Sequence, residues 1–483
     1  MKTLKYIPAL LAAAILSSCN FLEVQQTGKS SIKSFYSDIY ALDAAVYGAY
    51  SLTYSFYDNY MVLYPEVTGD LIRFNPSTTS WKEIFDFDSD ESEETSAVGY
   101  IWRKGYEIIA NANEIIKYGP EVSDRYPQQA SAVNDCIAQA YFLRALAHLD
   151  ICLAYGQTYT YTADASHPGI AVMTVIPDVQ AKISRSSAGE VYSQVVSDLE
   201  TALSIFSDSR SFDASYASPA ACKALLSRVM LYMGDYAEAA DLVGEVIDGY
   251  GLSLTPRDGY VQMFCNRQTG KEAIFRLNGY SAGTNLRSIY NYLEPKMYPS
   301  GKLLGLFSED KSRWPGNDIR TELLNYSAGG EDYSGVCMKF IDTEDITESE
   351  KHYDPFVLRL SEMYLIRAEA SCRLGNLKDA ADDIAALEAR ARGVQASEIT
   401  IPYTDAESLE DLVVRERMKE LFLEGHRLYD ITRRHETLSR DRNCGSSLIS
   451  MSYPDDRFIL PIPLVELDAN RNMTSNPVNS TQQ

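Results

Sequence analysis

Four ionisable residues recur at near-helical spacing toward the end of the chain: Glu416, Glu420, Glu424 and Arg427. Glycosidases use two carboxyl groups that flank the scissile bond, so this set could be imagined as an acid and a base. Charged residues four apart on a helix more commonly bind one another. We therefore predict ion pairs inside a helical scaffold and assign no catalytic residue. The same prediction covers three further residues: Glu362, Arg367 and Glu369.

Asp86, Asp88 and Asp90 alternate like the first ligands of a calcium loop. An EF-hand then needs a glycine at its sixth position and a bidentate glutamate at its twelfth, where this chain has Glu91 and Ala97. We interpret the run as a solvated acidic loop. The five histidines show no metal-ligand spacing, and the chain has no glycine-rich phosphate loop. The sequence therefore predicts no catalytic metal and no cofactor.

Trp81 follows a polar stretch, residues 77–80, instead of lying on an apolar helix face. Sugars stack the apolar faces of their rings on aromatic side chains, while polar groups bind the hydroxyls. Trp81 is thus the leading candidate for a ligand contact. Asp70 and Arg73 could supply polar partners, since arginine can engage neighbouring hydroxyls with two parallel donors. A second long loop segment adds four candidates: Tyr280, Tyr290, Tyr292 and Trp314. For each aromatic residue the alternative is local packing of its loop.

The first residues of the chain resemble an export signal. Lys2 and Lys5 precede a short apolar run over 7–16, and Leu16-Ser17-Ser18-Cys19 follows. This pattern predicts a signal peptide over 1–18 and resembles a bacterial lipobox, in which Cys19 would be acylated and anchor the protein to a membrane. The polar segment 19–34 would be a tether. The alternative is an ordinary secreted protein.

The chain has 483 residues, with 44 Lys and Arg against 67 Asp and Glu, which gives a net charge of -23. Nucleic acids and anionic bilayer surfaces would repel such a molecule, so a nucleic-acid function is disfavoured. The seven cysteines after Cys19 show no CxxC or zinc spacing, and most fall in helical apolar patterns. One disulfide among three of them remains open: Cys265, Cys337 and Cys444.

Apolar periodicity predicts long helices over 101–118, 135–155, 190–206 and 412–433. Gly119-Pro120 is expected to stop the first helix and Gly156 the second. Two further segments, 221–250 and 360–392, each read as helix-turn-helix, with turns at Gly234 and Gly375. They look like tetratricopeptide units that lie too far apart for an uninterrupted array.

The predicted fold is therefore mainly α: a single tetratricopeptide-like domain of helix pairs over 35–483, interrupted by long irregular insertions. These insertions cover 53–99 and 252–354, and a shorter irregular stretch covers 159–183. Loops of this length inside a globular protein are usually functional.

The chain resembles the SusD/RagB family of outer-membrane nutrient-binding lipoproteins. The resemblance covers nearly the whole sequence and depends on motifs in a fixed order. They include Cys19-Asn20-Phe21-Leu22, Ala138-Gln139-Ala140-Tyr141-Phe142-Leu143-Arg144-Ala145, Arg359-Leu360-Ser361-Glu362-Met363-Tyr364 and Leu460-Pro461-Ile462-Pro463. One departure is Val478-Asn479 after Asn476-Pro477, where the family often has Gly and an aromatic residue.

The resemblance implies a helical scaffold on the cell surface that captures oligosaccharides or other nutrients and is not an enzyme. It also implies a position as a lid over a TonB-dependent outer-membrane channel of the SusC type. In the starch-binding members, ligand contacts come from the loop that here carries Trp81 and from the long middle insertion. Two alternatives remain: an envelope scaffold without a small ligand, and a surface glycosidase.

Overall fold

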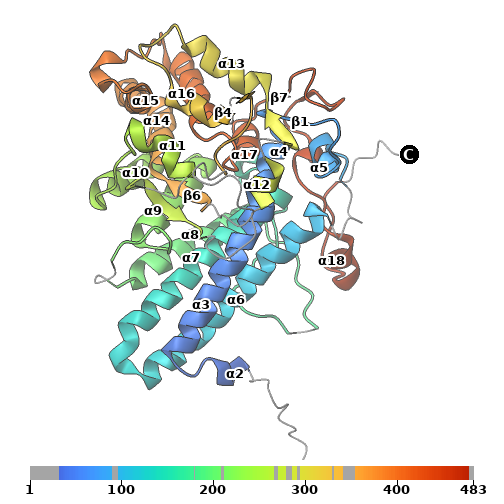
Figure 1. Ribbon diagram of the computed structural model, residues 1–483. Helices are drawn as coiled ribbons and strands as arrows, with labels where there is room; N and C mark the ends of the chain where they lie inside the picture. Colours follow the sequence, from blue (N-terminus) through green and yellow to red (C-terminus); the bar gives the residue numbers. More distant parts are fainter. Residues whose placement is uncertain are drawn as a thin grey trace, which may run out of the picture.

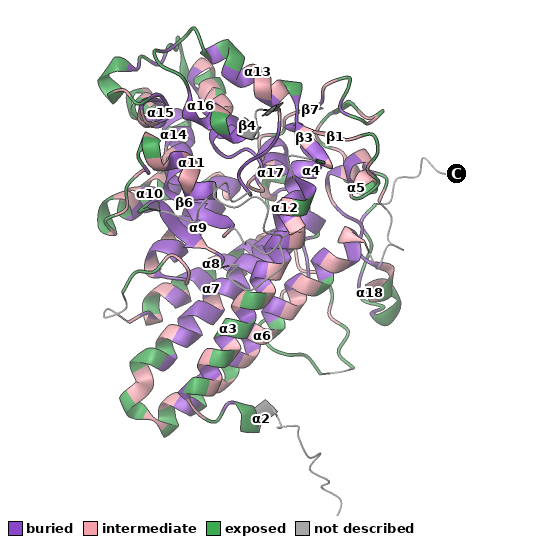
Figure 2. Ribbon diagram, viewed as in Figure 1, coloured by how far each residue is buried: buried purple, intermediate pink, exposed green. Residues whose placement is uncertain are grey.

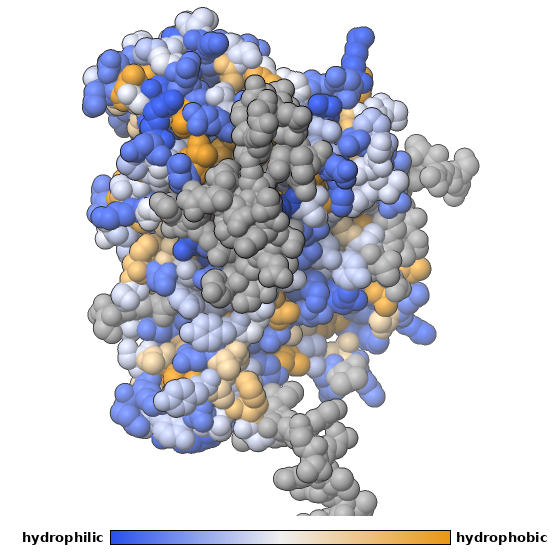
Figure 3. All heavy atoms as spheres, in the orientation of Figure 1, coloured by the Kyte–Doolittle hydropathy of each residue, from blue (hydrophilic) through white to orange (hydrophobic). Residues whose placement is uncertain are grey.

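The computed structural model describes residues 32–89, 96–178, 180–207, 211–265, 270–278, 285–290, 294–328, 331–340 and 354–477. Helices predominate among them, and the strands are short and paired in twos (Figure 1). The prediction of a mainly α fold is confirmed. The predicted signal peptide and Cys19 lie outside the described residues. On the face seen in Figure 3, hydrophilic residues predominate and hydrophobic ones form small patches.

Four long helices build the first part of the scaffold: α3 (Ile39–Phe56), α6 (Ala97–Arg125), α7 (Ala130–Tyr155) and α8 (Ala188–Ile205). α3 packs on α6 and α7, and α7 packs on α8 (Figure 1). Asp38 and Ser187 cap α3 and α8 by accepting backbone N–H groups in the first turn. The segment Pro127–Tyr155 is apolar enough to cross a membrane by length and composition, but 89% of its apolar window is buried inside the fold (Figure 2). It is a core helix.

The stop predicted at Gly119-Pro120 is wrong, because α6 continues to Arg125. Gly119 lies where α6 crosses α7, and a Cβ there would be 2.5 Å from Cγ1 of Ile137. Val122 is fully buried and carries the apolar stripe one turn further. Burial of this last turn offsets the backbone hydrogen bond that Pro120 cannot donate.

Both predicted helix-turn-helix units are confirmed: α9 (Pro219–Met233) with α10 (Tyr236–Gly249), and α14 (Leu360–Leu374) with α15 (Leu377–Arg392). Gly234 and Gly375 form the turns with φ of 83° and 81°, a left-handed conformation that glycine adopts without a Cβ clash. α10 packs directly on α14, although the long middle insertion separates them in sequence. The helix pairs therefore form one continuous stack.

The single helix predicted over 412–433 is instead two helices, α16 (Ala406–Glu420) and α17 (Arg427–Arg433). Leu423 and Gly425 between them have φ of 60° and 91°. A Cβ on Gly425 would lie 2.9 Å from the backbone oxygen of Met61. The chain leaves the helical path here because this segment approaches the first insertion closely.

The insertions contain short elements. The first begins inside α3 and stays helical through a π-helical turn, so it is less loop-like than expected; its elements are η2 (Tyr57–Met61), α4 (Leu63–Val67), β1 (Ile72–Phe74) and α5 (Lys82–Asp86). The middle insertion contains α11 (Arg257–Cys265), β2 (Ala273–Arg276), α12 (Asn285–Ile289), β3 (Met297–Pro299), α13 (Gly301–Asp310), η5 (Ile319–Leu324), β4 (Asn325–Ala328) and β5 (Glu331–Ser334).

Strands pair antiparallel as β1 with β3, β4 with β5, β2 with β6 (Phe356–Arg359), and β7 (Leu438–Ser439) with β8 (Ser450–Met451). The remaining elements are α2 (Ile32–Phe35), η3 (Pro127–Gln129), η4 (Tyr159–Tyr161), η6 (Ala396–Glu398), η7 (Asp456–Phe458) and α18 (Leu464–Ala469).

Candidate functional site

The two insertions are joined by backbone pairing between β1 and β3. Arg73 lies opposite Tyr298 in this ribbon. The pairing continues beyond both strand ends, because the Ser300 amide donates to the Leu71 carbonyl at 2.8 Å and the Asn75 amide donates to the Lys296 carbonyl at 3.0 Å. The first and middle insertions therefore meet at this ribbon.

Arg440 fixes the loop that leads from α4 to α5. Its guanidinium donates to the backbone oxygens of Gly69 at 2.9 Å, Phe85 at 2.6 Å and Val67 at 3.2 Å. It also lies 4.0 Å from the centroid of the Phe85 ring. Burial lowers the pKa of Arg440 to about 10. One buried cation thus holds three carbonyls, and the loop is positioned before any ligand arrives.

Three half-buried aromatic residues form a row that we name the aromatic surface: Tyr60, Trp81 and Tyr100. The rings of Tyr60 and Trp81 are 6.3 Å apart, and those of Tyr60 and Tyr100 stack at 5.7 Å with an interplanar angle of 19°. The exposed Arg103 extends the row, with its guanidinium carbon 4.7 Å from the Tyr100 ring centroid. Partly exposed aromatic faces in a row can stack on successive sugar rings.

Burial, with a smaller contribution from Tyr100, raises the pKa of Tyr60 above its ordinary value. A phenol is protonated at neutral pH even at its ordinary pKa of about 10, so the Tyr60 hydroxyl can donate a hydrogen bond to a ligand oxygen. An aromatic face and a donor are thus available on one side chain.

Trp81 has a left-handed backbone with φ of 65° and ψ of 7°. This conformation costs a bulky L-residue about 1–3 kcal/mol and persists only where the surroundings impose it. The amide of Lys82 donates to the Thr79 carbonyl, and the amide of Phe85 donates to the Trp81 carbonyl, so hydrogen bonds hold the backbone on both sides. Such strain is frequent at ligand-binding positions.

Sequence reasoning missed Tyr60, Tyr100 and Arg103. Tyr60 lies in a π-helical turn that periodicity did not predict. Tyr100 precedes the buried Ile101 on α6 and is itself half-buried, so it lies beside the apolar stripe. A tyrosine at the edge of a stripe, followed three residues later by arginine, was the available signal.

Arg73 keeps the exposure expected of a binding residue. Its side chain is half-buried, and its guanidinium carbon lies 4.4 Å from the ring centroid of Tyr298. Trp81 and Arg73 thus both stay accessible on the first insertion but contact different aromatic partners.

Asp70 is a correction, because it is fully buried and already occupied. Its Oδ1 accepts from Nε of Arg427 at 2.7 Å and its Oδ2 accepts from Nζ of Lys302 at 2.5 Å. Burial alone would raise the pKa of Asp70, but the two cations outweigh it and lower the pKa to about 2. This carboxylate joins α17 to the insertions and is not free to bind a hydroxyl.

Tyr290 and Trp314 are also corrections, since both lie in the interior. Tyr290 is fully buried and stacks on Phe340 at 5.5 Å. Trp314 is 7% exposed, and its indole N–H donates to the Thr400 carbonyl at 2.9 Å. The local-packing alternative holds for these two residues. Tyr280 and Tyr292 lie outside the described residues.

The glutamates of α16 and the following turn form the predicted ion network. Arg320 is fully buried and bonds to Glu416 at 2.5 Å and Glu420 at 3.0 Å. Arg359 is nearly as buried and bonds to Glu420 at 2.7 Å and Glu424 at 2.7 Å. These glutamates are at most 6% exposed at the side chain. They therefore cannot flank a glycosidic bond.

The other predicted scaffold pairs are confirmed with partners from neighbouring helices. Glu362 bonds to Arg228 at 2.6 Å. Arg367 bonds to Asp383 at 2.7 Å. Glu369 bonds to Arg433 at 2.6 Å. Burial alone would raise the pKa of Glu369, but Arg433 and Arg434 outweigh it and lower the pKa to about 2.

Glu66 binds backbone N–H groups where the chain passes from α16 to α17. Its Oε1 accepts the backbone N–H groups of Gly425 at 3.0 Å, His426 at 2.9 Å and Arg427 at 3.4 Å. Burial outweighs these donors and raises the pKa of Glu66 to about 7. The helix is interrupted because its free amides bind this carboxyl group from α4.

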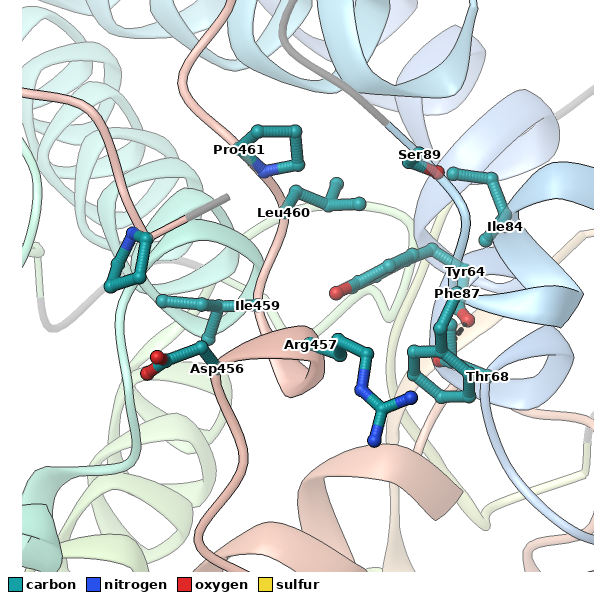
Figure 4. Close-up of a pocket in the computed structure, with 11 residues that line it drawn as sticks. Tyr64, Thr68, Ile84, Phe87, Ser89, Asp456, Arg457, Ile459, Leu460 and Pro461 are labelled. Carbon is teal, nitrogen blue, oxygen red and sulfur yellow. Dashed lines mark hydrogen bonds between the residues drawn. The ribbon is translucent and has the colours of Figure 1, made fainter. Parts of the chain in front are cut away.

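A pocket lies between the first insertion and the C-terminal segment (Figure 4). The Tyr64 hydroxyl points into the space between Leu460 and Arg457 in this view. Arg457 is already paired with Asp455 at 2.8 Å. The Asn476 amide group donates to the Leu460 carbonyl at 2.7 Å and ties the segment down. We attribute this pocket to packing of the C-terminal segment.

No group of three potential metal ligands gathers among the residues that the structure describes. In the acidic run Lys82 pairs with Asp86, Asp88 is exposed, and Asp90 lies outside the described part. Cys337 and Cys444, two of the three candidates for a disulfide, are buried free thiols.

Two family models match the chain. One is described as the SusD family and matches residues 309–478. The other is described as "Starch-binding associating with outer membrane" and matches residues 20–231. The chain is 25% identical to SusD-like protein P2 of Formosa agariphila, over 95% of this chain and 96% of that protein. It is 24% identical to SusD-like protein P38 of the same organism, over 89% and 90%.

Solved structures share the fold. A SusD superfamily protein from Bacteroides thetaiotaomicron matches with a TM-score of 0.80 at 24% identity, covering 91% of this chain and 100% of that one. A SusD-like carbohydrate binding protein from Bacteroides vulgatus matches with a TM-score of 0.73 at 20% identity, covering 92% and 100%. The fold thus has counterparts among solved structures over at least 91% of this chain.

Proposed function

The chain belongs to the SusD family, and we propose that it is a lipid-anchored surface protein that binds an oligosaccharide and delivers it to a TonB-dependent channel of the SusC type. The names of the matching family model and of the carbohydrate-binding relative support a sugar ligand and an outer-membrane location. The aromatic surface is the observation that carries the proposal, because it places three half-buried aromatic side chains in a row, with Trp81 on a loop that Arg440 holds in position.

Binding without chemistry fits the placement of the charged residues. Glu416, Glu420 and Glu424 are enclosed by arginines, and their carboxylates balance those cations instead of facing a ligand. A glycosidase would need two carboxyl groups beside the bound sugar. The aromatic surface instead carries phenol, indole and guanidinium groups, which bind glycans but do not hydrolyse them.

The test is calorimetric titration of the mature chain with a panel of oligosaccharides, comparing the parent with Trp81→Ala. We expect Trp81→Ala to weaken binding by about tenfold or more, because it removes an aromatic face from the proposed site. The melting temperature should be unchanged, because the side chain is only partly buried where it packs against the core. Trp314→Phe is the matched control. It removes a buried indole donor, so it should lower the melting temperature and leave affinity unchanged.

Three results would count against the proposal. Retained affinity in Trp81→Ala would remove the site from the aromatic surface. Absence of any glycan binding would favour the envelope-scaffold alternative. Release of shortened products from a bound oligosaccharide would identify a glycosidase instead.

Anchoring and delivery are tested separately. Cys19→Ala should release the protein from the membrane fraction, and continued membrane attachment would refute the acyl anchor. Solubilised outer membranes should yield a TonB-dependent channel together with the tagged parent protein. Isolation of the protein without such a channel would refute delivery to a SusC-type partner while leaving glycan binding intact.

A further inference from the structure

The outer side of the β1–β3 ribbon presents cations next to an aromatic ring. Side chains alternate across a strand, and Phe74 and Met297 point inward and are buried. Arg73 and its partner Tyr298 are therefore on the outer side, and the register places Lys296, two residues from Tyr298, on that side as well. All three outer residues are half-buried. We name this set the ribbon face: Arg73, Lys296 and Tyr298.

The arginine of the ribbon face lacks a carboxylate partner. Among the described residues neither Arg73 nor Lys296 forms an ion pair, and Arg73 contacts the ring of Tyr298 at 4.4 Å. This is unusual in a chain of net charge -23, in which acidic partners are plentiful. Most other arginines that lie over rings also bond to a carboxylate, as Arg367 over Tyr364 bonds to Asp383. Arg440 is an exception, because its guanidinium binds backbone carbonyls.

The aromatic surface repeats the arrangement at its own edge. Arg103 is exposed and lies 4.7 Å from the Tyr100 ring centroid, and the described residues offer it no carboxylate. Arg103 thus lies at the edge of the aromatic surface, and Arg73 lies over a tyrosine on the β1–β3 ribbon of the insertion that also carries Trp81. Stacking occupies the face of a guanidinium and leaves its edge free, and that edge carries paired N–H donors spaced to bind a carboxylate or a sulfate.

We propose that the ligand is an acidic glycan, whose carboxylate or sulfate groups bind Arg73 and Arg103 while its sugar rings stack on the aromatic surface. This inference rests on the proposed glycan-binding function and specifies the ligand class. A neutral glycan would leave both charged donors without a charged acceptor. An acidic glycan supplies charge-assisted hydrogen bonds, which are about twice as strong as neutral ones. Lys296 adds positive potential next to Arg73 without a fixed geometry.

The experiment compares charged and neutral forms of the same sugar chain. The mature protein is first screened on an array of neutral and acidic glycans. Calorimetry then measures an oligogalacturonide against its methyl-esterified form, and a sulfated galactan oligosaccharide against its desulfated form. The first pair tests a carboxylate and the second a sulfate ester. We expect at least one charged form to bind about tenfold more tightly than its neutral counterpart.

Two single variants and a matched control locate the effect. Arg73→Gln and Arg103→Gln should each weaken binding of the preferred charged form by about five- to tenfold and change binding of the neutral form less than about twofold. Lys117→Gln is the control, because Lys117 is exposed and lies over the Tyr118 ring on the same helix as Arg103. It is about 21 Å further along α6 and should have no effect on either ligand.

The possible outcomes test the acidic-glycan assignment separately from the glycan-binding proposal on which it rests. Equal or tighter binding of the neutral forms would overturn the acidic-glycan assignment and keep the glycan-binding proposal. An equal loss in Lys117→Gln would show that overall charge, and not these two arginines, sets affinity, which also overturns the assignment. Failure to bind any glycan on the array would overturn both.

Discussion

Arginine behaves differently in two regions of this molecule. Around α14 to α17, Arg320, which comes from η5 of the middle insertion, and Arg359 are buried, and each bonds to several glutamates. Arg73 on the first insertion and Arg103 on α6 instead lie over tyrosine rings and form no ion pair among the described residues. The same side chain is thus saturated where the fold must be specified and unsaturated where a ligand can bind.

This difference indicates how to separate structural from binding residues. A buried charge without a partner costs several kcal/mol, which explains why several carboxylates surround each of Arg320 and Arg359. An exposed charge in water costs little when unpaired, so a binding surface can keep it available. Whether a charged side chain already has an oppositely charged partner is therefore a better guide to function here than its residue type.

The largest effect is expected when the central cation of the buried ion network is removed. Arg320→Met leaves a cluster of carboxylates without their shared cation, among them Asp318, Glu388 and Glu416. We expect a loss of about 3–5 kcal/mol in the free energy of unfolding, measured by urea denaturation. Arg373→Gln is the control, because that side chain is 42% exposed in its pair with Glu410 and should cost less than about 1 kcal/mol. Similar losses in the two variants would mean that burial does not distinguish these ion pairs.

A second variant concerns Glu66, which lies on the first insertion and binds the backbone between α16 and α17. The folded-state pKa of Glu66, about 7, lies above its ordinary value of 4.5, so its contribution to stability is complete below about pH 4.5 and is lost as the pH rises through 7. Glu66→Gln stays neutral at every pH. Relative to the parent, it should gain about 2–3 kcal/mol in unfolding free energy between pH 5 and pH 8.

The prediction concerns the change in unfolding free energy between pH 5 and pH 8. A constant cost of the buried amide in Glu66→Gln is the same at both pH values and therefore cancels. Denaturation curves at both pH values provide the measurement. An equal difference between parent and variant at pH 5 and at pH 8 would show that Glu66 remains ionised throughout this range.

The smallest expected effect concerns the aromatic surface. Tyr60→Ala removes the ring between Trp81 and Tyr100 and should weaken glycan binding by about 1 kcal/mol. Tyr118→Ala is a fitting control, since Tyr118 stacks on Tyr36 at 5.0 Å near the other end of α6. It should reduce stability without changing affinity. If Tyr118→Ala weakened binding as much, the loss would reflect a general loosening of α6.

Periodicity predicted the helix pairs because their stripes and glycine turns are local. It could not predict that α6 continues past Pro120, which depends on contact with Ile137. Nor could it predict the break before α17, which depends on Met61 and Glu66 far away in sequence.

The predicted site residues also divide into those that local sequence could identify and those whose environment depends on distant segments. Loop composition correctly indicated that Trp81 and Arg73 are accessible. It could not distinguish them from Asp70 or Trp314, whose burial is determined by Lys302 and by the Thr400 carbonyl on other segments.

The direct contact between α10 and α14 has one more consequence. Because these helices close on each other, the middle insertion leaves and re-enters the stack at neighbouring points. Lengthening a loop whose ends are already held together costs little extra entropy. Changes in the length of the middle insertion can therefore be accommodated without altering the contact between α10 and α14.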